Sequence, residues 1–128
     1  MAPGRMYDGF VPGRHLIDSY GAGGFRFAEM SHRGSILALP SGIKAWEVTS
    51  PAEFSLDAFA PVLAEAAEID VLLVGTGREA AALPEALRRR FKDAGIGVDA
   101  MQTGAAARTY NILAAENRKV AAALVAVP

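Results

Sequence analysis

A short apolar run, a glycine turn and a predicted helix follow one another in the order that nucleotide-binding loops use. Residues 71–74 lead into Gly75, Thr76 and Gly77, and the next three residues complete the loose pattern G-x-G-x-x-G/A. Such a turn can offer backbone amides to a phosphate. Pro84 opposes dinucleotide binding, because it lacks an amide hydrogen and interrupts the helix. We therefore predict a strand-exit turn, with a small anion pocket at the three turn residues as the alternative.

A second group of small residues opens another predicted helix. Thr103 precedes Gly104 and three alanines, so it is either an ordinary helix cap or part of a site where the first amides bind a carboxylate or phosphate. Tyr110 and Asn111 follow one to two turns later. Since Asn is a modest helix former, its amide should bond either the backbone of a neighbouring loop, which we favour, or a ligand. A ligand pocket would combine these residues with the glycine turn.

One basic cluster and the single tryptophan are candidates for a protein-binding surface. On a helical wheel the apolar residues of 84–94 face inward, whereas Arg88, Arg89 and Lys92 face outward. These cations form either a solvated helix face or a docking patch for an acidic partner. Trp46 lies on a predicted hairpin and belongs either to the core or to a protein contact.

Other residue types that carry chemistry are absent or isolated. The chain has no cysteine, which removes thiol nucleophiles and thiolate metal ligands. His15 and His32 are far apart, so we expect no metal. Ser41 lacks the context of a nucleophile elbow, and Asp70 and Asp99 are expected to cap loops. We predict no catalytic group and no cofactor, and an enzyme is the less favoured function.

Length and composition indicate a folded protein of ordinary charge. The 128 residues are 52% hydrophobic and 21% charged, which fits one globular domain. The 13 Lys and Arg residues nearly balance the 14 Asp and Glu residues, so no field attracts nucleic acid or an anionic membrane. No apolar run approaches the ~20 residues of a membrane-spanning helix, and the first residues lack the apolar core of a signal peptide. We expect a cytoplasmic protein without a nucleic-acid partner and without membrane insertion.

The first third of the chain is rich in turn residues. Glycine and proline in residues 1–14 predict a flexible N-terminal arm, followed by a single α/β domain over 15–128. Short runs between turns predict strands in hairpins at 15–20, 25–30, 34–40 and 43–48. Hairpin strands leave unpaired amides at an edge, so a homo-oligomer is one arrangement that the protein could adopt.

After residue 50 the pattern alternates between helix and strand. Ser50, Pro51 and Glu53 have the spacing of a capping box, and helical periodicity follows over 55–68. Strands are predicted at 71–74, 97–101 and 119–127, and helices at 84–94, ended by Gly95, and at 103–117. This order predicts right-handed crossovers and a largely parallel sheet covered by helices, with the hairpins at one side.

Several of these segments match a known family. They are Asp18-Ser19-Tyr20, Ile43, Trp46, DVLLVGTG at 70–77, TGAAARTYNIL at 103–113, Glu116, Arg118 and VAAAL at 120–124. From Ile17 to Val125 the chain resembles the Mth938-like family of small α/β domains of unknown function. This family includes a mitochondrial respiratory complex I assembly factor and an adipogenesis-associated protein.

The resemblance implies a three-layer α/β fold around a mixed, mostly parallel sheet, with one strand antiparallel to the others and an N-terminal hairpin layer. It also implies a non-catalytic interaction or assembly protein, whose partner would be a component of a respiratory complex or of membrane-protein assembly. The short form without a targeting extension looks bacterial. The alternative function is binding of an anion or nucleotide, or an enzyme, at the turn of Gly75, Thr76 and Gly77 and the helix start at Thr103.

Overall fold

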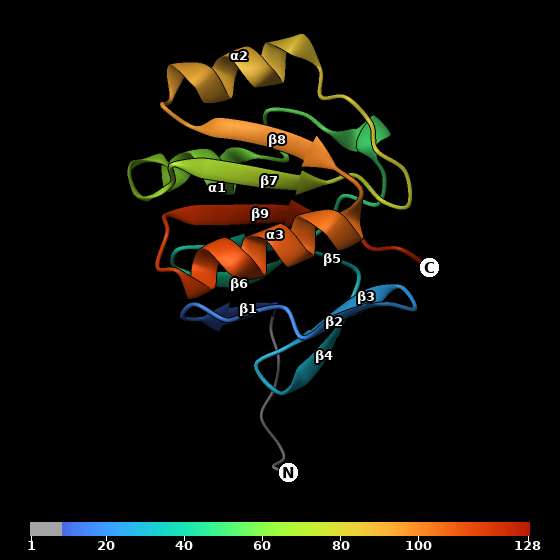
Figure 1. The fold of residues 1–128 in the computed structure, drawn as a ribbon. Coiled ribbons are helices and arrows are strands. Elements are labelled where there is room, and N and C mark those ends of the chain that lie inside the picture. Colours follow the sequence, from blue (N-terminus) through green and yellow to red (C-terminus); the bar gives the residue numbers. More distant parts are fainter. Residues whose placement is uncertain (1–8) are drawn as a thin grey trace.

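The computed structural model describes residues 9–128, which form one six-stranded and one three-stranded sheet (Figure 1). The strands are β1 (Phe10–Pro12), β2 (Ser19–Gly21), β3 (Gly24–Phe27), β4 (Met30–Arg33), β5 (Ser35–Leu39), β6 (Gly42–Trp46), β7 (Val71–Gly75), β8 (Gly97–Met101) and β9 (Val120–Leu124). The helices are α1 (Ala60–Ala64), α2 (Glu85–Asp93) and α3 (Thr103–Ala115), with short 3-10 turns η1 (Pro51–Glu53) and η2 (Ala66–Glu68).

The large sheet has the order β1-β6-β5-β9-β7-β8. Strands β7, β8 and β9 are parallel, β5 is antiparallel to β9, and β6 and β1 continue the antiparallel half. Four strands therefore run one way and two, β5 and β1, run the other way. The predicted mixed, mostly parallel sheet is confirmed, with β1 as a second antiparallel strand beyond the one that the resemblance implied.

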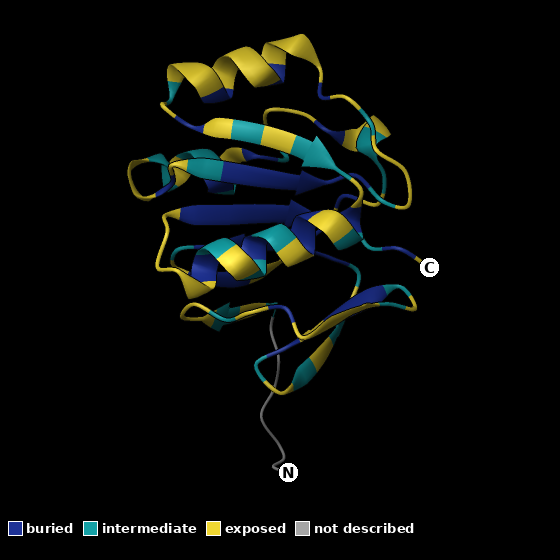
Figure 2. Ribbon diagram, viewed as in Figure 1, coloured by how far each residue is buried: buried dark blue, intermediate teal, exposed yellow. Residues whose placement is uncertain are grey.

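Helices cover both faces of this sheet. The chain passes from β7 to β8 in one direction and returns past β7 to reach β9, so crossovers of one hand place α2 and α3 on opposite faces. Residues from α1 and α2 pack with Leu72 and Val74 on one face, whereas α3 and the small sheet β2-β3-β4 pack with Leu73 and Ile36 on the other. The three predicted layers are confirmed, and Figure 2 shows the buried central strands between them.

Strand β9 is the centre of the sheet and joins its two halves. All five of its residues are buried, and three of them are alanines. One edge of β9 pairs with β5, which belongs to the antiparallel half, and the other pairs with β7, which belongs to the parallel half. Small side chains on β9 and on α3 let that helix lie close to the strand.

The expected N-terminal arm requires a correction. Residues 1–8 lie outside the described part of the chain, but Phe10–Pro12 form β1, which pairs with β6. Among the described residues, Gly9 and Gly13 flank this strand of three residues, and Pro12 ends it. Residues 10–12 form a strand because they pair with β6, and not because of a local sequence pattern.

The prediction of one helix over 55–68 is also wrong. The structure has turns over 56–59, the five-residue α1 and the 3-10 turn η2. Pro61 accounts for this, because proline is accepted only in the first turn of a helix and α1 has to begin beside it. The side chain of Ser50 makes no cap bond, and the Glu53 carboxylate instead accepts a hydrogen bond from the Thr49 hydroxyl at 3.0 Å.

The second hairpin was only partly predicted. Residues 25–30 span a turn instead of one strand, since Ala28 and Glu29 have φ of 50° and 62° between β3 and β4. Turns with two such residues usually carry glycine or asparagine, so the alanine and glutamate at these positions do not indicate a turn. Of the first predicted strand, 15–20, only Ser19 and Tyr20 pair in a sheet, and residues 15–18 run along α3.

Candidate functional site

The glycine turn after β7 is closed by hydrogen bonds within the protein. The Thr76 amide donates to the carbonyl oxygen of Met101 at 2.8 Å, and the Gly77 amide donates to the hydroxyl of Thr103 at 2.9 Å. Gly75 lies in the ladders of β7 with β8 and β9. The amides that could have bound an anion are therefore already paired.

Thr103 connects three segments of the chain. It is fully buried, and its hydroxyl donates to the carbonyl oxygen of Val125 at 2.7 Å while it accepts from Gly77. Its own amide donates to the carbonyl oxygen of Gly77 at 2.9 Å. The predicted cap role is wrong, because Gln102 is the N-cap residue and Thr103 is the first helical residue. Thr103 instead ties the β7 turn and the segment after β9 to the start of α3.

Gly75 has a packing role. A Cβ atom at this position would lie 2.8 Å from the Cα atom of Thr103 and 3.0 Å from Cδ2 of Leu124. Only glycine leaves room for the start of α3 to approach β7 so closely. The close packing of α3 on β7 therefore explains the glycine at position 75 without a ligand.

Asn111 holds an N-terminal segment against α3. Its Oδ1 accepts from the amide of Ile17 at 2.8 Å, and its Nδ2 donates to the carbonyl oxygen of the same residue at 2.8 Å. The side chain therefore pairs with a backbone as a neighbouring strand would. This is the loop alternative that we favoured from the sequence.

Tyr110 holds the residues just before Ile17. Its ring is buried, and its hydroxyl donates to the carbonyl oxygen of His15 at 3.2 Å. Burial raises the pKa of the Tyr110 phenol above its usual value, and the nearby Arg14 guanidinium opposes that shift. Arg14 also donates to the carbonyl oxygen of Val120 at 3.1 Å, so residues 14–17 are fastened to α3 and β9 together.

Replacing Asn111 should release this segment. We expect Asn111→Ala to lower the free energy of unfolding by about 1–3 kcal/mol, because the backbone groups of Ile17 lose both partners. Hydrogen exchange of the Ile17 amide, followed by NMR, should become faster. Asn111→Asp is the matched variant, since it can still accept from the amide but cannot donate to the carbonyl. Unchanged exchange in Asn111→Ala would contradict the assigned role.

A groove lies between residues 17–20 and the outer side of α3, and we call it the α3 groove. Its volume is about 650 Å³. Its lining residues are Ile17, Asp18, Ser19, Tyr20, Gln102, Gly104, Ala105, Ala107, Arg108, Asn111 and Ile112. Of the six residues predicted for a ligand pocket, only Asn111 lines it. The structure brings Gly75, Thr76, Gly77 and Thr103 together elsewhere, and Tyr110 faces the core.

The groove combines apolar, aromatic and charged side chains. Tyr20 is 48% exposed and Ile112 is 53% exposed. The Tyr20 ring lies over the backbone of α3, since a Cβ atom at Gly104 would be 2.7 Å from its Cζ. Arg108 is exposed and forms no ion pair with the described residues. Sequence reasoning did not predict Tyr20, Arg108 and Ile112 as a site, because their exposure depends on the docking of residues 17–20 on α3.

The residues predicted for a partner surface separate in the structure. Arg88, Arg89 and Lys92 are exposed on α2 and line a hollow of about 640 Å³ beside β8. Arg89 lies 3.9 Å from Glu85, and such an exposed pair contributes little stability. Trp46 as a partner contact is wrong, because it is 6% exposed and its Nε1 donates to the carbonyl oxygen of Ala58 at 2.8 Å.

The described residues contain no group of three or more His, Asp or Glu side chains that could hold a metal ion. His15 lies 3.0 Å from the carbonyl oxygen of Pro12, and His32 lies 3.1 Å from that of Ser35. Within residues 9–128, none of the helices has the length and apolar character needed to cross a membrane. The α3 groove combines apolar, aromatic and charged side chains, which suits a ligand or partner.

A family model described as "Protein of unknown function (DUF498/DUF598)" matches residues 17–125. An uncharacterized protein of Rhodobacter capsulatus is 38% identical over 88% of this chain and 85% of its own length. The NADH dehydrogenase [ubiquinone] 1 alpha subcomplex assembly factor 3 of Danio rerio is 32% identical, and that of Homo sapiens is 30% identical. Both matches cover 88% of this chain, which spans 65% and 61% of those proteins.

Solved structures share the fold. The crystal structure of an outer membrane protein from Bartonella henselae is 53% identical, with a TM-score of 0.88 over 91% of this chain and 98% of that chain. A solution NMR structure of a Mth938-like domain from Bordetella pertussis is 30% identical, with a TM-score of 0.77 over 94% of this chain and 91% of that chain. The described chain therefore has a Mth938-like fold.

Proposed function

Because this chain belongs to the family described as "Protein of unknown function (DUF498/DUF598)", we propose that it is a non-catalytic protein that binds a partner protein during the assembly of a larger complex. The assembly factors of Danio rerio and Homo sapiens support this role. By analogy with them, the partner is a subunit or accessory protein of an NADH dehydrogenase complex. We place the protein in the cytoplasm, acting on subunits before they enter that complex.

The α3 groove is the observation that carries the proposal. Aromatic side chains and arginines are common hot spots of protein interfaces, and Tyr20 and Arg108 lie together here with the exposed Ile112. A partner would place an apolar side chain between Tyr20 and Ile112, while Arg108 pairs with a carboxylate at the rim. The wall of the groove is fixed by the bonds of Asn111 to Ile17, so binding requires little ordering of this segment.

The hydrogen-bond donors at the glycine turn are already paired, which favours the binding of a partner protein over the binding of an anion at this turn. Thr76, Gly77 and Thr103 direct their amides and hydroxyls to groups of the protein itself. A phosphate at this turn would have to break these bonds before it gained any new ones. The turn therefore serves the fold that presents the groove.

Groove variants test the proposal in a bacterium that carries both this protein and an NADH dehydrogenase complex. We expect Tyr20→Ala together with Ile112→Ser to reduce co-purification of the complex's subunits by about tenfold or more, as the loss of a hot spot does. Assembled NADH dehydrogenase, measured on native gels, should decrease with it.

Leu56→Ser is the matched control, because Leu56 is 49% exposed and lies on the segment leading to α1, away from the groove. It should leave both measurements unchanged. Equal losses in the control and in the groove variant, or normal assembly without the groove side chains, would refute the proposed role.

A further inference from the structure

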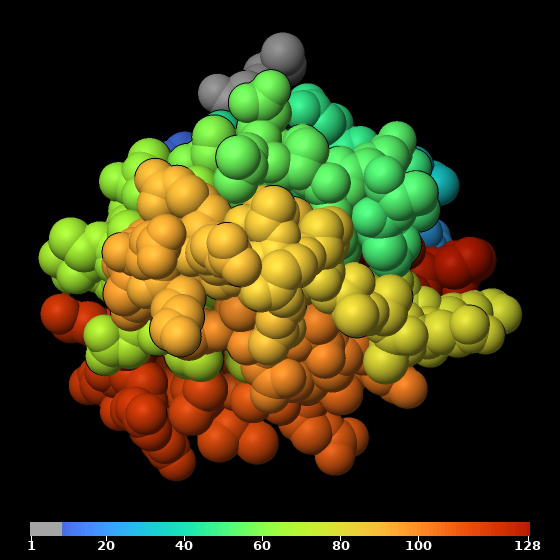
Figure 3. All heavy atoms as spheres, turned by 90° about the horizontal axis from the view of Figure 1, so that it is seen from above, coloured from blue at the N-terminus to red at the C-terminus, as the bar shows by residue number. Residues whose placement is uncertain are grey.

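Strand β8 is an outer strand of the large sheet with one side unpaired. It pairs in parallel with β7, and the order of the described strands places no strand beyond it (Figure 1). Figure 3 looks down on this end of the molecule, where α2 and β8 lie side by side at the surface. Gly97 and Asp99 of this strand are exposed, and Val98 and Ala100 are half-buried, so part of the edge is accessible beside α2.

Two hydrogen bonds identify the backbone groups that face outward. The Gly97 amide donates to the carbonyl oxygen of Asp70 at 2.9 Å, and the Thr76 amide donates to that of Met101 at 2.8 Å, so Gly97 and Met101 face β7. Backbone groups alternate in direction along a strand. The amide and carbonyl of Val98 and of Ala100 therefore face away from β7 and have no hydrogen-bond partner among the described residues.

The other outer strands are less suited to accept a partner strand. Strands β1 and β2 have three residues each, and β1 ends in Pro12, which has no amide hydrogen. Strand β4 has four residues and ends in Arg33. Strand β8 has five residues and neither a proline nor a bulge, so it is the longest edge strand in the described chain, and Asp99 at its centre is its one charged residue.

A second copy of the chain fits this edge poorly. Two-fold pairing of β8 strands would be antiparallel, and the register that satisfies both unpaired residues places Val98 opposite Ala100 of the other copy. Asp99 of each copy would then lie directly opposite the other, in the closely spaced type of pair. Like charges in that position are destabilising.

We propose that β8 accepts an extended segment of another protein as an antiparallel strand, with a lysine or arginine of that segment opposite Asp99. The Val98 and Ala100 side chains pack toward the cluster beneath α2, so neighbouring residues of the added strand would face α2. Hollows of about 640 Å³ and 310 Å³ lie there on either side of Arg88 and can receive those side chains. Backbone bonds give the affinity, and the charge opposite Asp99 gives the register.

Two synthetic peptides serve as probes, acetyl-Thr-Val-Thr-Lys-Thr-Val-Thr-amide and the same peptide with Asp at its centre. We expect the lysine peptide to bind the full chain about tenfold more tightly, measured by fluorescence anisotropy. NMR shifts should change at the amides of Val98 and Ala100. Asp99→Lys should reverse the preference, because it reverses the charge without altering the backbone.

Ala100→Pro should abolish binding of both peptides, since it removes an outward amide that makes no bond in the fold. The melting temperature and circular dichroism of Ala100→Pro show whether this variant is folded. If it is not folded, the reversed peptide preference of Asp99→Lys still tests the proposal. Tyr20→Ala should leave peptide binding unchanged, which separates this site from the α3 groove. Equal binding of the two peptides, shifts confined to other residues, or a dimer that Ala100→Pro converts to monomers would overturn the proposal.

Discussion

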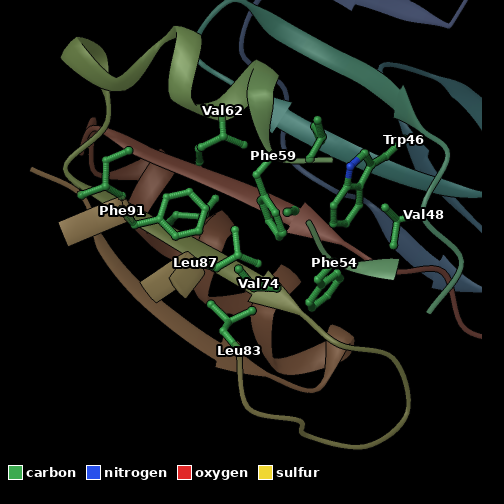
Figure 4. Close-up of a cluster of buried hydrophobic side chains, with 14 of the residues drawn as sticks. Trp46, Val48, Phe54, Phe59, Val62, Val74, Leu83, Leu87 and Phe91 are labelled. Atoms are coloured by element: carbon green, nitrogen blue, oxygen red, sulfur yellow. The ribbon is translucent and has the colours of Figure 1, made fainter. Parts of the chain in front are cut away.

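Phe59→Ala is expected to lower the free energy of unfolding by about 3–5 kcal/mol, which is the usual cost of removing a buried aromatic ring. Phe59 is fully buried, and its ring centroid lies 5.3 Å from those of Phe54, Trp46 and Phe91 in edge-on contacts (Figure 4). It is therefore the contact between α1, β6 and α2. Since α1 has five residues and little helical stability of its own, its position depends on this ring.

Urea denaturation, followed by circular dichroism and by the fluorescence of Trp46, measures this effect. Leu56→Ala is the control, because Leu56 lies three residues earlier and is half exposed. It should change the free energy of unfolding by no more than about 0.5 kcal/mol. A loss below about 1 kcal/mol in Phe59→Ala would mean that the aromatic cluster does not hold α1 in place.

Thr103→Val is expected to destabilise the protein by about 2–4 kcal/mol although it changes almost no volume. The substitution leaves the Gly77 amide and the Val125 carbonyl without their partner, and each unsatisfied buried group costs about 1–3 kcal/mol. Thermal and urea unfolding measure the loss. Hydrogen exchange at Gly77 should accelerate as well, because the turn is no longer held to α3.

Two variants separate the hydroxyl from the size of the side chain. Thr103→Ser keeps the hydroxyl and should recover most of the stability lost in Thr103→Val. Thr109→Val, on the same helix, should stay within about 0.5 kcal/mol of the wild type, because the Thr109 hydroxyl makes no hydrogen bond with the described residues. If Thr103→Val were as stable as Thr109→Val, the three-way connection through Thr103 would not contribute to stability.

The elements predicted well from the sequence are those whose pattern is local. Residues 71–74 form a continuous apolar run, and β7 is covered on both faces. The helix predicted at 84–94 is α2, and Gly95 has the left-handed φ of 81° that ends it. Periodicity and glycine act within one or two turns of chain, so a single sequence reveals them.

Elements that depend on distant partners were missed. Strand β1 has no alternating pattern and exists because β6 offers an edge. The sequence did not decide whether Trp46 is buried, because its burial depends on contacts with Phe54 and Phe59, which lie in a later segment of the chain. Such choices are made by tertiary packing, which overrides local preference.

The candidate site shows the same division. Gly75 and Thr103 were singled out from the sequence as parts of a possible ligand pocket, but in the structure their packing and hydrogen bonds serve the fold. The spacing of such residues does not tell whether a helix or a ligand fills the available space. The groove beside Tyr20, Arg108 and Ile112 could not be derived, since it forms only when residues 17–20 dock on α3. Exposure of these side chains is a property of the fold and not of the sequence pattern.

The central position of β9 has a consequence for how the protein is made. As the ribosome releases the chain, β1, β6 and β5 can pair first, and β7 and β8 can pair later, but these two groups meet only through β9. Until β9 has left the exit tunnel, each group exposes an unpaired strand edge and apolar surface. Synthesis that stalls before residue 120 would therefore leave an aggregation-prone product for chaperones or proteases.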